Sequence, residues 1–376
     1  MKRILKVTEF NEFQTLKDRW NDSLSKSLDN NVFSTWEWLS TWWKHFGEEK
    51  RLIILLIEDK NKILAIAPFA YSKYSFLGFG NLKKISFAGS DETDYTSFIL
   101  REKKIKFLEL FFDYLNNHID WDYLELKDIS ETSASAHLLR RIPTQKQYKH
   151  WDERVCNLCP YVPLPSSMDV LIKGLGQSKR RNLRRYLRKL KENYHVELKK
   201  YNEVGSVKEA METFIRLHQK RWESEGKPGG FKNPSFRSFH IDVAKCFDEK
   251  GWLGLYFLTA NDEPIAAEYN FEHNQKSYNY LPGWDVEYSQ YRVSDLTKMH
   301  IIENCIQKGL KEYDMMRGDE PYKSEWTTLA RKNLEVRFVQ KGVFPRIYNW
   351  LIKKAAFQNL SSKLRLSLKA MAQNEK

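Results

Sequence analysis

Hydrophobic and polar positions follow a pattern that occurs twice along the chain. Apolar runs flank a short polar turn at 51–71 and again at 252–272, and this arrangement predicts a β-hairpin in each half. Each predicted hairpin is followed by a further strand, a helix and another strand. The sequence therefore predicts a tandem duplication of one unit, in which a mixed α/β (α+β) sheet is flanked by helices.

The boundary between the two predicted units falls where three prolines occur within 160–165. Proline has no backbone N–H, so we expect this segment to be a linker that continues neither a helix nor a central strand. The predicted organisation is then an N-terminal domain at 1–160, a C-terminal domain at 166–343 that carries the site, and a helical tail at 344–376.

The composition is that of a folded protein, with 376 residues, 41% hydrophobic and 30% charged. The net charge of +13 is concentrated in 173–200 and 331–376, which each hold eleven Lys or Arg against two Glu. Localised positive charge predicts an anionic partner, which could be a phosphorylated cofactor, a nucleic acid or an anionic lipid surface.

The tail at 344–376 combines Trp350 and neighbouring apolar residues with several lysines. This pattern fits a basic amphipathic helix that lies on an anionic membrane surface, and it equally fits a helix packed on the protein body. The N-terminus lacks the apolar core of a signal peptide, and the four cysteines are scattered. We therefore expect a cytoplasmic protein, at most peripheral at the inner face of the membrane, without a metal.

The densest polar cluster directly follows a predicted strand at 312–315. It comprises Asp314, Arg317, Asp319, Glu320, Tyr322, Lys323 and Trp326. Charged side chains at a strand end are how α/β proteins commonly build sites, although a solvated loop has the same composition.

This cluster resembles the pattern D-x-x-R-G-x-E-x-Y-K-x-x-W of a GNAT-superfamily branch. That branch is related to Fem-type aminoacyltransferases and to acyltransferases associated with cellulose biosynthesis. Further stretches resemble the same branch in the same order: the tryptophan-rich segment 33–47, the basic helix at 178–190, and Leu217-His218 with Arg221-Trp222. The resemblance implies tandem GNAT-like domains and an acyl-transfer activity.

One position departs from the family pattern. The family commonly has Ser-Pro-Gly before the helix that follows the third strand, and here Arg292-Val293-Ser294 stands there. Without glycine the backbone approaches a phosphate less closely. The resemblance thus leaves two donors open, acyl-CoA such as acetyl-CoA, and aminoacyl-tRNA.

These observations assign candidate roles. The catalytic candidates are Glu268, Asp319, Glu320, Tyr322 and Lys323, with Glu268 or Asp319 as the base and Tyr322 or Lys323 as the oxyanion or phosphate contact. The substrate-binding candidates are Arg221, Trp222, Tyr278, Tyr280, Asp314, Arg317 and Trp326. The cofactor-binding candidates are Lys179, Arg180, Arg184 and Ser294. We expect the first half to hold no comparable polar cluster.

The leading functional hypothesis is transfer of an acyl or aminoacyl group onto an amine or hydroxyl of a cell-envelope or polysaccharide-related acceptor. Two alternatives remain at this stage. One is a nucleic-acid-binding module that uses the basic helix at 179–189, with tRNA as one such ligand. The other is a GNAT scaffold without catalysis.

Overall fold

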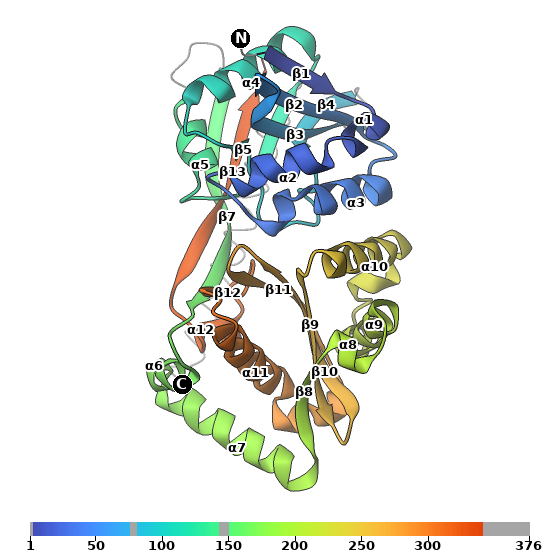
Figure 1. The fold of residues 1–376 in the computed structure, drawn as a ribbon, viewed down its shortest axis with the longest axis vertical. Coiled ribbons are helices and arrows are strands. Elements are labelled where there is room, and N and C mark those ends of the chain that lie inside the picture. Colours follow the sequence, from blue (N-terminus) through green and yellow to red (C-terminus); the bar gives the residue numbers. More distant parts are fainter. Residues whose placement is uncertain (1–2, 76–80, 143–149, 341–376) are drawn as a thin grey trace, which may run out of the picture.

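The computed structural model describes residues 3–75, 81–142 and 150–340. Their strands form one 13-stranded mixed sheet with the order β1-β2-β3-β4-β6-β13-β7-β12-β11-β10-β9-β8, and β5 pairs with β3 at the side. Figure 1 shows the two halves of the chain one above the other, connected by the long strands β7 and β13.

The elements of the first half follow the predicted order. Its strands are β1 (Arg3–Val7), β2 (Arg51–Asp59), β3 (Lys62–Ser75), β4 (Asn81–Phe87), β5 (Ile99–Leu100) and β6 (Tyr123–Ser130). Its helices are α1 (Phe10–Gln14), α2 (Lys17–Ser25), α3 (Trp36–Phe46), α4 (Ile105–His118) and α5 (Ala134–Leu139).

The second half repeats this order. Its strands are β8 (Val196–Lys200), β9 (Leu253–Ala260), β10 (Glu263–His273), β11 (Lys276–Trp284) and β12 (Glu312–Asp314). Its helices are α6 (Met168–Gly174), α7 (Gln177–Asn193), α8 (Tyr201–Val204), α9 (Val207–Ser224), α10 (Pro234–Glu249), α11 (Val293–Gln307) and α12 (Pro321–Ser324).

Strand pairing confirms the predicted tandem organisation. In the first half β1, β2, β3 and β4 pair antiparallel in sequence, and β4 pairs parallel with β6 after the crossover through α4. In the second half β8, β9, β10 and β11 pair in the same way, and β11 pairs parallel with β12 after the crossover through α11. The two halves thus share one topology.

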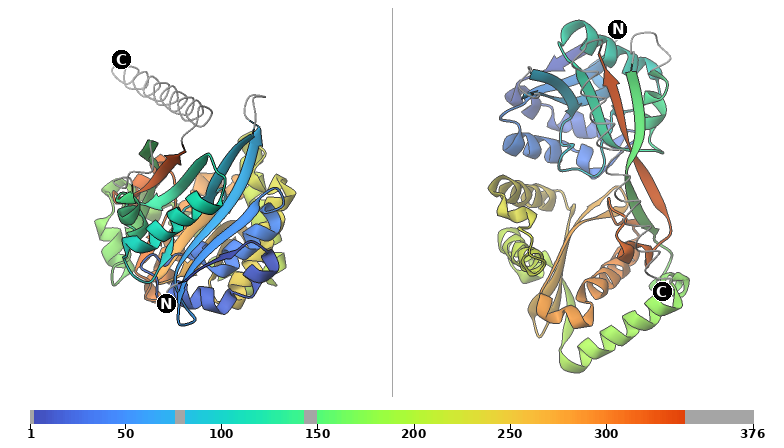
Figure 2. Two further views of the ribbon diagram at one scale, coloured as in Figure 1. Left: turned by 90° about the horizontal axis from the view of Figure 1, so that it is seen from above. Right: turned by 180° about the vertical axis from the view of Figure 1, so that it is seen from behind.

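The last strand of each half pairs with the other half. Strand β13 (Ala330–Val339), from the second half, lies between β6 and β7. Strand β7 (His150–Pro163), from the first half, pairs with β13 and then, through Tyr161–Pro163, with β12. The back view in Figure 2 shows these two strands running between the halves.

This pairing corrects the prediction that 160–165 is a linker outside the sheet. Strand β7 includes Pro160 and Pro163. It pairs with β13 as far as Pro160 and with β12 from Tyr161 to Pro163. Proline lacks an N–H but keeps its carbonyl, and the Pro160 carbonyl accepts a hydrogen bond from the Met315 N–H at 2.9 Å. The domain bounds themselves remain a prediction.

A single apolar core joins the two halves on one face of the sheet. It combines Leu52, Ile54 and Leu56 of β2 with residues of α2, α3, α9 and α10. Trp38 of α3 lies 5.1 Å from Phe239 of α10 and 5.6 Å from Phe271, between ring centroids. The tryptophan-rich segment is therefore the contact between the halves. Separate cores fill the opposite face of each half, around α4 and around α11.

For membrane-spanning helices and metal sites, the structure bears on the described residues alone. Within 3–75, 81–142 and 150–340, no helix is long and apolar enough to cross a membrane, and no three His, Cys, Asp or Glu side chains are placed to hold a metal. The predicted amphipathic tail at 344–376 lies outside the described residues.

The strand exchange predicts that damage to the C-terminal strand destabilises the N-terminal half. Phe338 of β13 is fully buried, and its ring centroid lies 4.8 Å from that of Phe112 of α4. We expect Phe338→Ala to cost about 3–5 kcal/mol in urea unfolding, with faster amide exchange in β6. As a control, Lys332→Ala at an exposed position of the same strand should change the free energy of unfolding by no more than about 0.5 kcal/mol. Unchanged protection of β6 in Phe338→Ala would contradict this account of the fold.

Candidate active site

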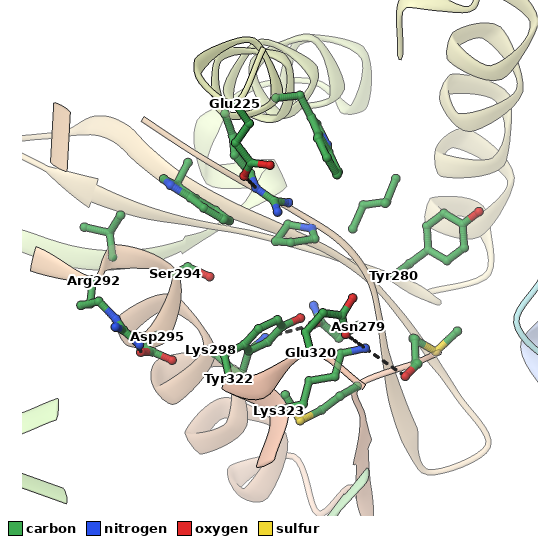
Figure 3. Close-up of a pocket in the computed structure, with 18 of the residues that line it drawn as sticks. Glu225, Asn279, Tyr280, Arg292, Ser294, Asp295, Lys298, Glu320, Tyr322 and Lys323 are labelled. Carbon is green, nitrogen blue, oxygen red and sulfur yellow. Dashed lines mark hydrogen bonds and ion pairs between the residues drawn. The ribbon is translucent and has the colours of Figure 1, made fainter. Parts of the chain in front are cut away.

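A cavity opens where two parallel strands diverge. Strands β11 and β12 pair only from Lys276–Glu312 to Tyr278–Asp314, after which β11 continues to Trp284 paired with β10 but without β12 on its other edge. Helix α11 begins beside this gap. The resulting cavity of about 730 Å³ is lined by residues after Tyr278, the loop after β12, α9 and the first turn of α11 (Figure 3).

The loop after β12 is held in shape by Asp314. This buried carboxylate accepts from the Met316 N–H at 2.9 Å, and Met316 has a positive φ of 60°. Tyr95 of the first half donates to the same carboxylate at 2.7 Å, and Arg331 of β13 lies 3.3 Å from it. Burial raises the pKa of Asp314 to about 6, and Arg331 and Tyr95 oppose that rise. Asp314 therefore shapes the turn from behind the cavity wall.

Lys323 of α12 holds the other end of this loop. Its buried ammonium donates to the carbonyls of Met316 at 3.2 Å and Arg317 at 2.7 Å, and it pairs with Glu320 at 3.0 Å. An ammonium has three hydrogens, so these contacts account for all its donors. Gly318 has a φ of 120°, a backbone conformation that residues with a Cβ rarely adopt, so glycine is favoured there.

The first half contributes side chains to this cavity. Asp94 contacts Arg317 twice, through the guanidinium at 3.0 Å and the backbone N–H at 2.9 Å. Burial raises the pKa of Asp94 despite this pairing. Glu92 also lines the cavity, and its backbone carbonyl accepts from the Tyr280 hydroxyl at 2.8 Å. Burial, reinforced by Asp91, raises the pKa of Glu92 above its ordinary value. We expected no polar cluster in the first half comparable to that at 314–326. The structure corrects this, because Glu92 and Asp94 of the first half line the cavity.

A closed polar network lies behind the β11 wall. Glu268 of β10 pairs with Lys298 of α11 at 2.7 Å, and it accepts from Asn279 at 3.1 Å and from the Tyr313 hydroxyl at 2.5 Å. Glu268 and Lys298 are both about 1–2% exposed, so this is a desolvated ion pair. Asn279 and Lys298 reach the cavity, but Glu268 does not.

The wall opposite the α12 cluster carries an arginine between two indoles. The guanidinium carbon Cζ of Arg221 lies 4.6 Å from the ring centroid of Trp222 and 4.4 Å from that of Trp284. Trp222 is oriented by a bond from its indole N–H to His218 at 3.0 Å, and burial lowers the pKa of His218 to about 4, so that the imidazole is neutral and accepts. Gly283 is needed here because a Cβ would lie 2.6 Å from the His218 backbone nitrogen.

The structure gathers part of the predicted set. On the cavity lie Arg221, Trp222, Tyr280, Ser294, Arg317, Glu320, Tyr322 and Lys323. Off it lie Glu268 and Trp326, which are buried, Asp319, which is exposed, and Lys179, Arg180 and Arg184 of α7. Tyr278 and Asp314 face a smaller cavity of about 280 Å³ between the halves.

The polar cavity residues that sequence reasoning missed include Glu92, Asp94, Asn279, Asp295 and Lys298. The acidic run Asp91-Glu92-Thr93-Asp94 was a visible signal, since it follows a strand in the first half just as the 314–326 cluster does in the second. Nothing in the sequence alone showed that it faces the second half. Lys298 sits on a helix with a weak amphipathic pattern, so its burial gave no signal.

Comparison with known proteins fits this geometry. Residues 177–324 match the family model described as an acetyltransferase (GNAT) domain. This part of the second half is therefore similar to a GNAT acetyltransferase domain. The match contains α9, β11, α11, the loop after β12 and α12, which all contribute residues to the cavity lining. A comparison with curated proteins finds no match.

Solved structures share the tandem fold of the whole chain at low identity. FemX aligns with a TM-score of 0.62 and 11% identity, over 89% of this chain and 96% of that chain. The C-terminal domain of a putative lysylphosphatidylglycerol synthetase from Agrobacterium fabrum aligns with a TM-score of 0.52 and 10% identity, over 89% and 93%. A tandem GNAT protein from the clavulanic acid biosynthesis pathway gives 0.51 and 8%, over 91% and 100%.

The buried Glu268–Lys298 pair yields a stability prediction. Lys298→Met should cost about 3–5 kcal/mol in urea unfolding, because it leaves the Glu268 carboxylate buried without its cation. The double variant Lys298→Met/Glu268→Gln removes both charges and should recover much of that loss. A single-variant loss below about 1 kcal/mol would show that the pair is not desolvated as described.

Proposed function

We propose that the cavity between β11, β12 and α11 transfers an acyl or aminoacyl group onto an amine or hydroxyl of a cell-envelope or polysaccharide-related acceptor. The observation that supports this most is the meeting of four features on one cavity: a half-buried carboxylate, a tyrosine hydroxyl, a strand edge that β12 no longer covers, and a stacked guanidinium. The named fold relatives FemX and a putative lysylphosphatidylglycerol synthetase are compatible with an envelope-related acceptor.

Glu92 is the base in this proposal. The attacking amine must be neutral, and a carboxylate with a raised pKa accepts its proton more readily than an ordinary surface carboxylate. Glu268 and Asp319, the bases expected from sequence, are less suitable, since Glu268 is bound by Lys298, Asn279 and Tyr313 and Asp319 is exposed away from the cavity. The nitrogen attacks the acyl carbonyl carbon, and its proton passes to the Glu92 carboxylate. The bond from that carbon to the sulfur or ribose oxygen of the donor then breaks, and the leaving atom takes up the proton.

Tyr322 is the proposed oxyanion contact. Its ring lies at the cavity next to Glu320, and its hydroxyl has no hydrogen-bond partner among the described residues (Figure 3). Burial raises the pKa of Tyr322, so the phenol keeps its proton and donates. The backbone of β11 beyond Tyr278 has lost β12 as a partner and offers further polar groups. Lys323, by contrast, keeps the loop in place with all its donors.

The acceptor lies, in this proposal, against Arg221. The Arg221 Nε lies 3.5 Å from the Glu225 carboxylate, an ion pair that is not a hydrogen bond, and this buried nitrogen has no hydrogen-bond partner in the part of the chain that the structure describes. With both faces covered by indoles, Arg221 binds an oxyanion through its edge. An acceptor that carries a carboxylate or phosphate would span the cavity from Arg221 to Glu92.

Two donors remain within the proposal, acyl-CoA and aminoacyl-tRNA. Helix α7 exposes Arg181, Arg184, Arg185, Arg188 and other cations to solvent, which supports a polyanionic donor such as tRNA. These cations alone would also fit a nucleic-acid-binding module. A nucleic-acid-binding module would not need the cavity that Arg317, Glu320, Tyr322 and Lys323 line, so this cavity favours the enzyme.

Glu92→Gln tests the proposal directly. Purified protein would be incubated with acyl-CoAs or with charged tRNA and a small-molecule cell extract, and protein-dependent mass gains would be read by mass spectrometry. We expect Glu92→Gln to lower kcat about 10²–10⁴-fold, because the base is lost. A variant with wild-type kcat would rule out Glu92 as the base.

The pH dependence provides a matched control. The carboxylate of Glu92 works only when ionised, so wild-type activity should fall as pH drops through its raised pKa. Asp91→Asn removes a nearby negative charge and should move this acid limb to lower pH while keeping the plateau rate. An acid limb that stays in place in Asp91→Asn would argue for another titrating group.

The Arg221 proposal predicts a change in acceptor affinity. For the acceptor that the mass-spectrometric screen identifies, Arg221→Gln should raise KM about tenfold or more, with a smaller effect on kcat, because a charge-assisted contact is removed. Arg216→Gln, an exposed arginine on the same helix and off the cavity, should leave both values unchanged. Equal effects of the two variants would exclude a specific contact.

A further inference from the structure

The N-terminus of a helix can bind phosphate groups through its free backbone N–H groups, and α11 begins at the cavity. In this chain its first turn lines the cavity, with Arg292, Val293, Ser294 and Asp295 on the cavity surface (Figure 3). The N–H groups of a first helical turn lack partners within the helix and carry partial positive charge. Such a turn attracts an anion, and the question is which anion it holds.

An acidic side chain of the chain itself already stands there. Asp295 is the third residue of α11, and its carboxylate pairs with Lys179 of α7 at 2.7 Å and with Arg292 at 3.1 Å. The indole N–H of Trp326 donates to the same carboxylate at 3.3 Å. Burial on its own would raise the pKa of Asp295, but Lys179 and Arg292 outweigh it and lower that pKa, so the group stays ionised.

The cations next to this turn are also engaged. Lys179 is 6% exposed and lies between Asp295 and Glu325, 2.9 Å from Glu325 and 4.7 Å from the Trp326 ring centroid. Arg292, the other cation, is 3.8 Å from Glu325. Two cations and two carboxylates thus form one network in which the positive charge is already matched.

The backbone here also differs from a phosphate loop. Arg292 adopts the left-handed conformation, with φ of 51° and ψ of 45°, as the N-cap of α11. Glycine would leave this position open to a close approach of a diphosphate, whereas arginine carries a side chain that is tied to Asp295. The residues at the start of α11 therefore do not fit the diphosphate of coenzyme A.

We propose that Asp295 is a specificity-determining residue that closes the anion site of α11 to phosphate and so excludes a coenzyme A thioester held there. The proposal rests on the proposed acyl-transfer role of the cavity and narrows its donor. The negatively charged part of the donor must contact the protein elsewhere than at this helix. A donor without a diphosphate at this position satisfies that condition.

Isothermal titration calorimetry of the full-length protein tests this, with coenzyme A, pantetheine and inorganic diphosphate as three separate probes. Wild type should give no measurable binding of coenzyme A or diphosphate. Asp295→Asn keeps the shape and removes the negative charge, so both phosphorylated probes should bind at least tenfold more tightly than to wild type. Asp295→Asn/Glu325→Gln should strengthen them further, and pantetheine should be unaffected by either change.

The control is Asp169→Asn, which raises the net charge equally at the first turn of α6, where Asp169 is exposed. It should leave all three titrations as in wild type, and thermal unfolding should verify that each variant is folded. Micromolar binding of coenzyme A to wild type would overturn the proposal. Folded Asp295→Asn proteins without any gain would overturn it too. Both readouts are independent of transfer activity, so they separate this inference from the proposed function.

Discussion

The divergence of β11 from β12 is the constraint on which the site depends. The two strands are parallel neighbours for three residue pairs, and the buried carboxylate of Asp314 then turns the chain away at Met315 and Met316. Asp314 is held in turn by Tyr95 from the first half and by Arg331 from β13. This turn and the α11 crossover that follows β11 position two of the walls of the cavity.

The two halves are one structural unit at the site. Strand exchange places β13 within the first half and brings β7 next to β12, while α3 packs on α10 across a shared apolar core. This arrangement fixes the loop that carries Glu92 and Asp94 against Arg317 and Tyr280. The GNAT-like second half therefore has its cavity completed by carboxylates that the duplicated first half supplies.

The sequence was informative where local chemistry decides structure. The paired hairpins follow from periodicity, and four members of the 314–326 cluster, Arg317, Glu320, Tyr322 and Lys323, line the cavity. The roles of its members were harder to assign, because Lys323 and Asp314 bind loop carbonyls and amides that no pattern reveals. Pairings between distant segments were also hidden: the exchange of β7 and β13, the entry of Glu92, and the burial of Glu268 against Lys298 all depend on tertiary contacts.

The central claim is that acyl transfer occurs in the 730 Å³ cavity and not in the smaller cavity between the halves. Filling each cavity separately tests it: Leu281→Trp fills the first, and Leu28→Trp, a matched change, fills the second. Cells that lack the protein would be complemented with either variant, and the protein-dependent acylated products would be quantified by mass spectrometry. The account predicts that Leu281→Trp abolishes these products while Leu28→Trp leaves them at the wild-type level. Loss with Leu28→Trp and retention with Leu281→Trp would contradict it.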